Sequence, residues 1–225
     1  MFQGFSQRSI DFLWQLRFNN ERSWFLAHKE ELLSFVDAPM RELAQQITQA
    51  MEDAFPELRL ETKVSRIYRD ARRLHGRGPY KDHLWFSMRR PGTVDTATPC
   101  FYFELAPEYY SIGMGCYDAT PLTMAKFRQR IDSDPTPVTE LAKQLLTRPE
   151  FQLYGACYKR PKGDPGPLLY PWYNRRQIGI SADFNCDGIL FTPQLADQIL
   201  DAFQFLEPYY RYFRELPGDT APNHN

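Results

Sequence analysis

Apolar residues recur with helical spacing over the first 55 residues of the chain, which predicts a layer of antiparallel helices. Ser6 and Asn20 are the candidate N-caps of the first two helices, and a third helix is predicted to start at Asp37, with Pro39 in its first turn. The apolar stripe of the third predicted helix comprises Met40, Leu43, Ala44, Ile47 and Met51.

From about residue 60 the period changes to two, and β-branched and aromatic residues become frequent. Turn residues separate the segments, as expected for strands of a mostly antiparallel sheet. The segments that predict strands are KVSRIYR, HLWFSM, CFYFEL, YYSIGMGCY and QIGISADF.

Three Thr-Pro pairs predict further helix starts, because Thr supplies a capping oxygen and Pro suits the first helical position. The pairs are Thr120-Pro121, Thr136-Pro137 and Thr192-Pro193. Helices, then strands, then more helices and a late strand indicate the α+β class. We expect a mostly antiparallel sheet packed against N-terminal and C-terminal helices in a single domain, residues 1–216, with a disordered tail over residues 217–225.

The composition excludes several classes of protein. Apolar residues make up 43% and charged residues 24% of the chain, as in soluble globular proteins. No stretch approaches the roughly 20 apolar residues that span a bilayer, so we expect no membrane partner. The four cysteines form no C-x-x-C pair and the four histidines no closely spaced pair, so we expect neither a metal nor a cofactor. A cytoplasmic protein with reduced thiols fits this pattern.

Positive charge is concentrated in one segment, KVSRIYRDARRLHGRGPYK, residues 63–81. It contains seven Lys and Arg residues and one carboxylate, Asp70, a formal charge of +6, whereas the whole chain carries −1. Such a local excess attracts phosphates, carboxylates or nucleic-acid backbones. The segment therefore indicates a class of ligand more directly than it indicates a reaction.

Glycine and proline make the second half of this segment a predicted loop, which would return its end toward the preceding strand. Arginine forks and a lysine ammonium together suit an oxyanion. The alternative is that these residues pair with structural acids or lie in solvent. The predicted ligand-binding residues are Arg66, Arg69, Arg72, Arg77, Tyr80 and Lys81.

Asp70 and His75 are the candidate catalytic residues. Asp70 lies between Arg69 and Arg72, whose charges favour its ionised form. It could act as a general base or orient the arginines, and His75 could carry a proton near neutral pH. Glu104, in the predicted strand CFYFEL, is a candidate carboxylate facing the basic segment.

The motif R-I-Y-R-D-A-R followed by P-Y-K, with N-N-x-x-x-W-F-x-x-x-K upstream, resembles a bacterial and fungal family catalogued as domain of unknown function 2461. The resemblance extends to the Y-x-x-G-x-G-x-Y element at residues 110–117 and the K-R-P-K-G loop at residues 159–163. The family pattern F-S-K-D-K-T-P-Y-K carries an acid where this chain has Gly76. The resemblance implies a shared domain and shared motif residues, and it implies no reaction.

We therefore expect a protein that binds an anionic, phosphate-bearing small molecule. One alternative is a hydrolase or transferase acting on a phosphorylated substrate, but the chain contains no nucleophile elbow, P-loop or zinc spacing. Another is a nucleic-acid-binding or protein-interaction module. The pI near 6.4 and the confinement of charge to one segment favour a pocket over a long track for nucleic acid.

Overall fold

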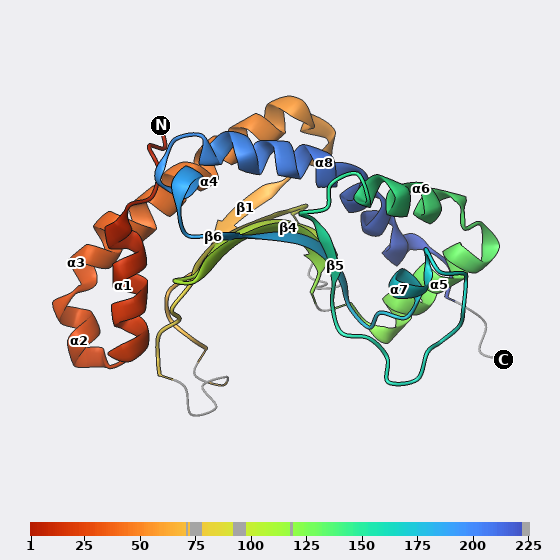
Figure 1. The fold of residues 1–225 in the computed structure, drawn as a ribbon, viewed down its shortest axis with the longest axis horizontal. Helices are drawn as coiled ribbons and strands as arrows, with labels where there is room; N and C mark the ends of the chain where they lie inside the picture. The colour runs from red at the N-terminus through yellow and green to blue at the C-terminus, as the bar shows by residue number, and fades with distance from the viewer. Residues whose placement is uncertain (71, 73–77, 92–97, 118, 222–225) are drawn as a thin grey trace. The chain divides into compact units, whose positions relative to one another are not determined.

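The computed structural model describes residues 1–70, 72, 78–91, 98–117 and 119–221 (Figure 1). The described α-helices are α1 (Gln7–Phe18), α2 (Arg22–Ala27), α3 (Lys29–Leu32), α4 (Ala38–Ala54), α5 (Pro121–Ser133), α6 (Thr136–Leu145), α7 (Tyr170–Tyr173) and α8 (Leu195–Glu215). Shorter helical turns are the π-turn η1 (Leu33–Asp37) and the 3-10 turns η2 (Pro56–Leu58), η4 (Gly188–Phe191) and η5 (Leu216–Gly218).

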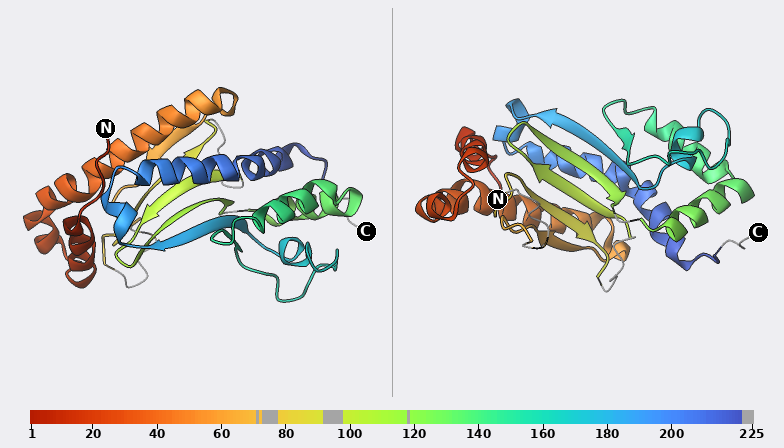
Figure 2. Two further views of the ribbon diagram at one scale, coloured as in Figure 1. Left: turned by 45° about the horizontal axis from the view of Figure 1, so that its top comes forward. Right: turned by 90° about the horizontal axis from the view of Figure 1, so that it is seen from below.

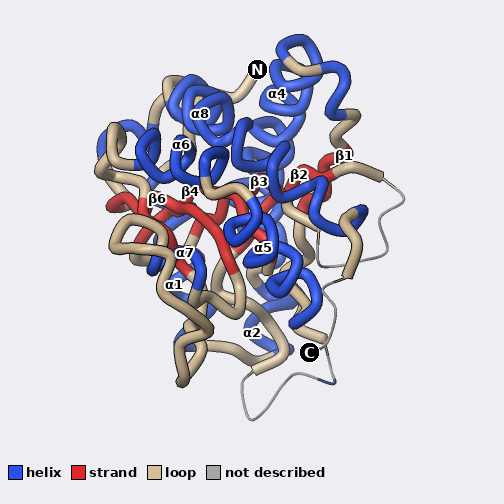
Figure 3. Tube along the Cα trace, turned by 90° about the vertical axis from the view of Figure 1, so that its right-hand side faces the viewer, coloured by secondary structure: helices blue, strands red, loops and turns tan. Residues whose placement is uncertain are grey.

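Six strands form one sheet in the order β1-β2-β3-β4-β6-β5. They are β1 (Glu61–Val64), β2 (Leu84–Arg89), β3 (Cys100–Leu105), β4 (Tyr109–Cys116), β5 (Gln152–Tyr154) and β6 (Ile178–Asn185). The pairs β1–β2 and β5–β6 are antiparallel, and Figure 3 shows the strands among the helices. The predicted α+β class, with an antiparallel sheet and N-terminal and C-terminal helices packed on it, is confirmed.

The chain folds into two compact units. The first contains residues 1–91, 102–112 and 183–202, and the second contains the described parts of residues 92–101, 113–182 and 203–225. The predicted boundary between a domain of residues 1–216 and a disordered tail stays a prediction. Within the second unit, however, the Lys126 ammonium donates to the Pro217 carbonyl oxygen at 2.7 Å, and Arg130 Nη2 donates to Asp219 Oδ1 at 2.7 Å.

In the first unit, strand alternation separates an apolar face of the sheet from a polar one. Leu84, Phe86 and Met88 of β2 are buried and alternate with the partly exposed residues of the same strand. The apolar face lies beneath α4, which runs along β1 (Figure 2), and the Thr48 and Thr62 hydroxyls hydrogen-bond between the two at 2.5 Å. The opposite face of β1 and β2 is thus left to polar side chains.

The first of the predicted N-terminal helix starts is confirmed. Ser6 precedes α1, where its N–H donates to Ser9 Oγ at 3.0 Å. Asp37 precedes α4 as predicted, but it is the last residue of η1, has helical dihedral angles and makes no side-chain capping hydrogen bond. The prediction for Asn20 is wrong, because Glu21 occupies the N-cap position of α2. Asn20 instead uses its amide to bind the backbone of a distant residue, Tyr80.

The second unit has its own aromatic core. The Phe101 ring packs against those of Phe203 and Tyr210, with centroids 5.0 and 4.6 Å apart. Thr120 caps α5 as predicted, its Oγ1 accepting from the Thr123 N–H at 3.1 Å. Burial of these aromatic rings removes a large apolar area from water and thereby stabilises the unit.

Other predicted boundaries differ from the structure. Helix α6 begins at Thr136 itself, so the predicted cap is displaced by one residue, and α8 begins at Leu195, after the Thr192-Pro193 pair. Strand β1 ends at Val64, whereas the segment KVSRIYR predicted a strand to Arg69. Strand β5 was not predicted, because three residues are too few to establish a period.

Replacing Phe103 tests the aromatic core of the first unit. Its ring is fully buried and contacts Phe5, Phe86 and Tyr110, with ring centroids about 6 Å apart. We expect Phe103→Ala to lower the free energy of unfolding by about 3–5 kcal/mol in urea denaturation, because it leaves a cavity. The matched control is Phe18→Ala, whose ring is 76% exposed and which should cost under about 1 kcal/mol. Equal losses would contradict the assignment of this core.

Candidate functional site

A pocket of about 830 Å³ opens on the polar side of β1 and β2, in the first unit. Six of its lining residues are cationic and one is a carboxylate. The lining consists of Lys63, Ser65, Arg66, Tyr68, Arg69, Asp70, Arg72, Lys81, Trp85, Ser87 and Arg89. This volume is within the range of small-molecule sites. Four of the predicted ligand-binding residues, Arg66, Arg69, Arg72 and Lys81, therefore line one concavity.

The early end of β1 explains why these cations meet. In a regular strand Arg66 and Arg69 would point to opposite faces of the sheet. After Val64 the chain leaves the regular ladder at Ser65, whose N–H donates to the Trp85 carbonyl at 2.8 Å and whose Oγ accepts from the Trp85 N–H at 3.0 Å. The residues that follow are thereby released from alternation, and both arginines reach the same pocket.

Backbone hydrogen bonds bring Lys81 back beside this segment. The Lys81 N–H donates to the Ile67 carbonyl at 2.7 Å, and the Arg69 N–H donates to the Pro79 carbonyl at 2.8 Å. The return of Lys81 toward the arginines, expected from the glycines and proline before it, is found. His75 and Arg77, two further predicted site residues, lie outside the described residues.

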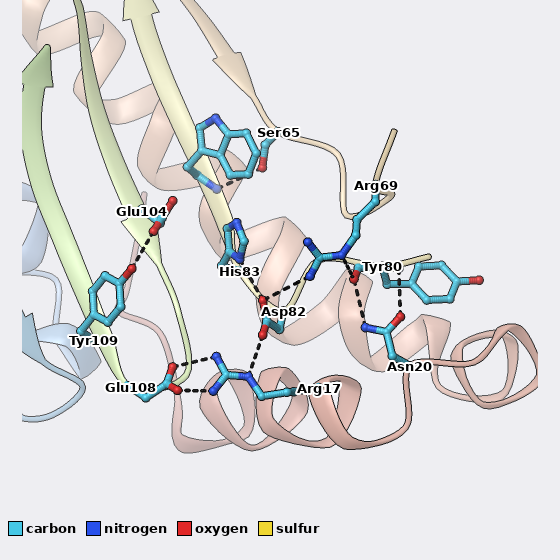
Figure 4. Close-up of polar contacts among 11 residues, drawn as sticks. Arg17, Asn20, Ser65, Arg69, Tyr80, Asp82, His83, Glu104, Glu108 and Tyr109 are labelled. Atoms are coloured by element: carbon cyan, nitrogen blue, oxygen red, sulfur yellow. Dashed lines mark hydrogen bonds and ion pairs between the residues drawn. The ribbon is translucent and has the colours of Figure 1, made fainter. Parts of the chain in front are cut away.

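Tyr80 has a structural position and is not part of the pocket lining. Its ring stacks on that of Phe25 with centroids 4.0 Å apart and is buried. The Asn20 side-chain amide hydrogen-bonds to both backbone groups of Tyr80: it donates to the Tyr80 carbonyl and accepts from the Tyr80 N–H, both at 3.0 Å (Figure 4). Arg69 Nε donates to the same carbonyl at 2.8 Å. Asn20 and Arg69 thus fix the residue that precedes Lys81.

Asp82, the residue after Lys81, is the centre of a charge network (Figure 4). It accepts from Arg17 Nε at 2.6 Å, contacts His83 Nδ1 at 2.9 Å and lies 3.8 Å from Arg69 Nη2. Arg17 also pairs with Glu108, and Arg17 Nη2 donates to Glu108 Oε2 at 2.8 Å. Burial favours the neutral form of Asp82, but hydrogen bonds from His83 and Arg17 outweigh it and lower the pKa of this carboxyl. Asp82 is therefore ionised and compensates Arg17 and Arg69.

Lys81 differs from these arginines. Its ammonium lies over the Trp85 ring, 4.0 Å from the centroid, and no carboxylate in the described part of the chain forms an ion pair with it. Burial lowers the pKa of Lys81 to about 8, and the positive charges of Arg69 and Arg66 lower it in the same direction. The lowered pKa of Lys81 thus reflects chiefly its partial burial, with a smaller contribution from the two neighbouring arginines.

Asp70 and Arg72 form an exposed pair at the rim. Arg72 Nη2 lies 3.2 Å from Asp70 Oδ2, and the Arg72 N–H donates to Asp70 Oδ1 at 3.0 Å. The Arg72 side chain is 89% exposed, so solvent weakens this pair. The Asp70 carboxylate thus accepts from both the backbone and the side chain of Arg72, and it orients the Arg72 side chain.

Glu104 lies on β3 with the partly exposed residues of that strand. Its Oε1 accepts from the Tyr109 hydroxyl at 3.1 Å, and burial together with the charge of Glu104 raises the pKa of Tyr109 to about 12. Glu104 also raises the pKa of Lys81, which places its charge near the basic cluster, as the sequence suggested. It does not line the pocket.

Six lining residues were absent from the predicted site: Lys63, Ser65, Tyr68, Trp85, Ser87 and Arg89. Strand pairing brings those of β1 and β2 together, with Lys63 opposite Ser87 and Glu61 opposite Arg89. Alternation within HLWFSMR would have placed Trp85, Ser87 and Arg89 on one face. The pairing register was the missing information.

Neither a metal cluster nor a membrane span is found in the described parts of the molecule. No group of three or more His, Cys, Asp or Glu side chains there is arranged to hold an ion. No helix there is both long and apolar enough to cross a bilayer.

The sequence matches the model of a known protein family. Residues 8–212 match the model of a family described as conserved hypothetical protein, domain of unknown function 2461, and the protein belongs to this family. The resemblance inferred from the motifs is confirmed. No curated protein matches the sequence.

Asp82→Asn tests the charge network. The lowered pKa of Asp82 means that its ionised form stabilises the folded protein above its ordinary pKa, and that this stability is lost as the pH falls through the lower folded value. We expect the variant to lose about 1–3 kcal/mol in urea denaturation at neutral pH, with the difference from wild type shrinking toward about pH 3. Glu140→Gln, which removes an exposed pair with Lys143, should cost under about 0.5 kcal/mol. A pH-independent loss at Asp82 would show that its charge is not the stabilising feature.

Proposed function

We propose that the pocket on β1 and β2 binds an anionic, phosphate-bearing small molecule. The observation that supports this most is the charge of the lining, six cations against the single carboxylate Asp70. Folded proteins usually compensate clustered charge, because like charges brought together destabilise the fold. An excess that persists inside a concavity indicates that a ligand supplies the missing negative charge.

The division of roles among the cations supports the same proposal. Arg69 is held by the Tyr80 carbonyl and by Asp82, and its side chain is only 17% exposed. Arg66 and Lys81 have no carboxylate partner in the described residues. We therefore assign Arg66 and Lys81 to direct contact with the anion, and Arg69 to shaping the pocket and its potential.

A small molecule is favoured over a nucleic acid. The cations line one concavity of about 830 Å³ on a chain whose net charge is −1. A nucleic-acid surface would require a longer basic track to follow successive phosphates. Trp85 and Tyr68 add two aromatic rings to the lining, which suits a ligand with an apolar or ring portion beside its phosphate.

We assign Asp70 to orienting Arg72 and give it no role in a reaction. A hydrolase or transferase would need a carboxylate directed at the substrate, and Asp70 is engaged by Arg72.

For the cellular compartment we propose the cytoplasm. All four cysteines are thiols in the structure, and burial raises the pKa of both Cys116 and Cys186, so these two are held in the unreactive form.

Arg66→Ala tests the proposed site. Inorganic sulfate and a panel of sugar phosphates and nucleotides, added at constant ionic strength, should raise the melting temperature of the wild type, because a ligand bound only by the native state stabilises it. Arg66→Ala should weaken the apparent affinity about tenfold while leaving the unliganded melting temperature nearly unchanged, because Arg66 is exposed. Added chloride should weaken binding by screening.

Arg41→Ala is the matched control for this experiment. Arg41 is an exposed arginine of α4 that pairs with Asp37 and does not line the pocket. Sulfate also stabilises proteins generally by exclusion from their surface, and that effect should be equal in both variants. Equal responses of the two variants to every anion would refute the site.

The pH dependence of sulfate binding tests the role of Lys81. A bound anion favours the ammonium form, so affinity should fall about tenfold as the pH rises from about 6.5 to about 9.5, through the pKa of about 8. Arg69 and Arg66, which lower this pKa, and Glu104, which raises it, are the charged groups facing Lys81. Sulfate is chosen because it does not itself titrate in this range.

Isothermal titration calorimetry measures this affinity directly. Lys81→Met should bind sulfate more weakly than wild type at the lower pH and should lose the pH dependence. An equally steep pH dependence in Lys81→Met would assign the effect to another group.

A further inference from the structure

Lys81 is the pocket residue whose position goes beyond what anion binding requires. Its backbone is fixed by the hydrogen bond to Ile67, and its amine lies against the Trp85 ring. Arg66 and Arg69 line the same pocket beside it. A permanent positive charge would be supplied better by a further arginine, whose guanidinium stays protonated and binds oxyanions through two donors.

The chemistry of an amine in these surroundings is different from that of a surface lysine. Burial and the two neighbouring arginines lower its pKa to about 8, so about one molecule in ten carries the neutral amine at pH 7. For a lysine of ordinary pKa the fraction is about one in several thousand. A desolvated lysine beside other cations is a recognised arrangement for nucleophilic attack on carbonyl groups.

We propose that Lys81 is a nucleophile that forms an imine with an aldehyde or ketone bearing a phosphate group. The proposal rests on the proposed function: an anion without a carbonyl contacts both Arg66 and the Lys81 ammonium, whereas in a ligand that carries both groups Arg66 would hold the phosphate and thereby place the carbonyl near the Lys81 amine. Proximity of this kind accounts for much of the rate of an intramolecular reaction. The Trp85 ring covers one side of the amine, its centroid 4.0 Å from the Lys81 nitrogen.

The step is balanced without an oxidant or reductant. The neutral amine of Lys81 adds to the carbonyl carbon, and the nitrogen proton moves to the oxygen to give a carbinolamine. A second proton moves from nitrogen to the hydroxyl, water leaves, and a C=N bond remains. The phosphate is unchanged and stays bound through its oxygens.

Labelling of the full chain with pyridoxal 5′-phosphate, followed by borohydride reduction, tests the proposal. Reduction fixes an imine as a stable amine, which intact mass and peptide mapping then locate. We expect a predominant single adduct at Lys81, formed at least about tenfold faster at neutral pH than the adduct at Lys63 in the same sample. Lys63 is the internal control, because it lines the same pocket but is exposed on β1.

Two comparisons assign the adduct to the site. Pyridoxal, which lacks the phosphate, should label Lys81 more slowly, and inorganic phosphate should protect Lys81 from the phosphorylated probe. Lys81→Arg should keep the positive charge and the fold, as judged by its melting temperature, and should lose the adduct. Because the peptide map is obtained on wild type, the test does not depend on this variant.

The outcomes separate this inference from the proposed function. Labelling spread evenly over surface lysines, or faster at Lys63 than at Lys81, would overturn the role of Lys81 as a nucleophile. If sulfate binding depends on Arg66 while Lys81 is not labelled, the anion site stands and the imine inference fails. If neither anion binding nor labelling is found, both fail.

Discussion

The alternation of side chains along β2 and β3 is the constraint on which the rest of the first unit depends. Phe86 and Phe103 point to the helix-covered face and stack on each other, with centroids 5.7 Å apart. Once these rings are buried, the neighbouring residues Trp85 and Glu104 must lie on the opposite face. The core therefore determines which side of the sheet is polar, and the basic pocket lies on that side.

The carboxylate of Asp82 then determines which cations of the pocket remain available to a ligand. Asp82 compensates Arg17 and Arg69, whereas its neighbour Lys81 lies over the Trp85 ring and has no acid partner in the described chain. Hydrogen bonds from His83 and Arg17 lower the pKa of Asp82, whereas the pKa of Lys81 is lowered chiefly by burial and further by Arg69 and Arg66. Asp82 stabilises the scaffold, and Lys81 is left available to a ligand in the pocket.

Sequence patterns were sufficient where the determining interactions are local. The strand CFYFEL has the predicted bounds, and the basic cluster was found because its charges lie within one segment. Sequence patterns failed where residues far apart in the sequence determine the local structure. Asn20 binds Tyr80, 60 residues away, and so does not cap a helix, and Arg17 meets Asp82 across 65 residues. No periodicity encodes such pairs, so the division between structural and ligand-facing cations required the structure.

The most direct test of the central claim, that the pocket holds an anion through Arg66 and Lys81, is anomalous diffraction from a crystal soaked in tungstate, a tetrahedral oxyanion. We expect the strongest tungsten peak in the pocket, with oxygens of the tungstate within hydrogen-bond distance of the Arg66 guanidinium and the Lys81 ammonium. Peaks confined to other surface lysines and arginines, with the pocket empty at the same tungstate concentration, would contradict it.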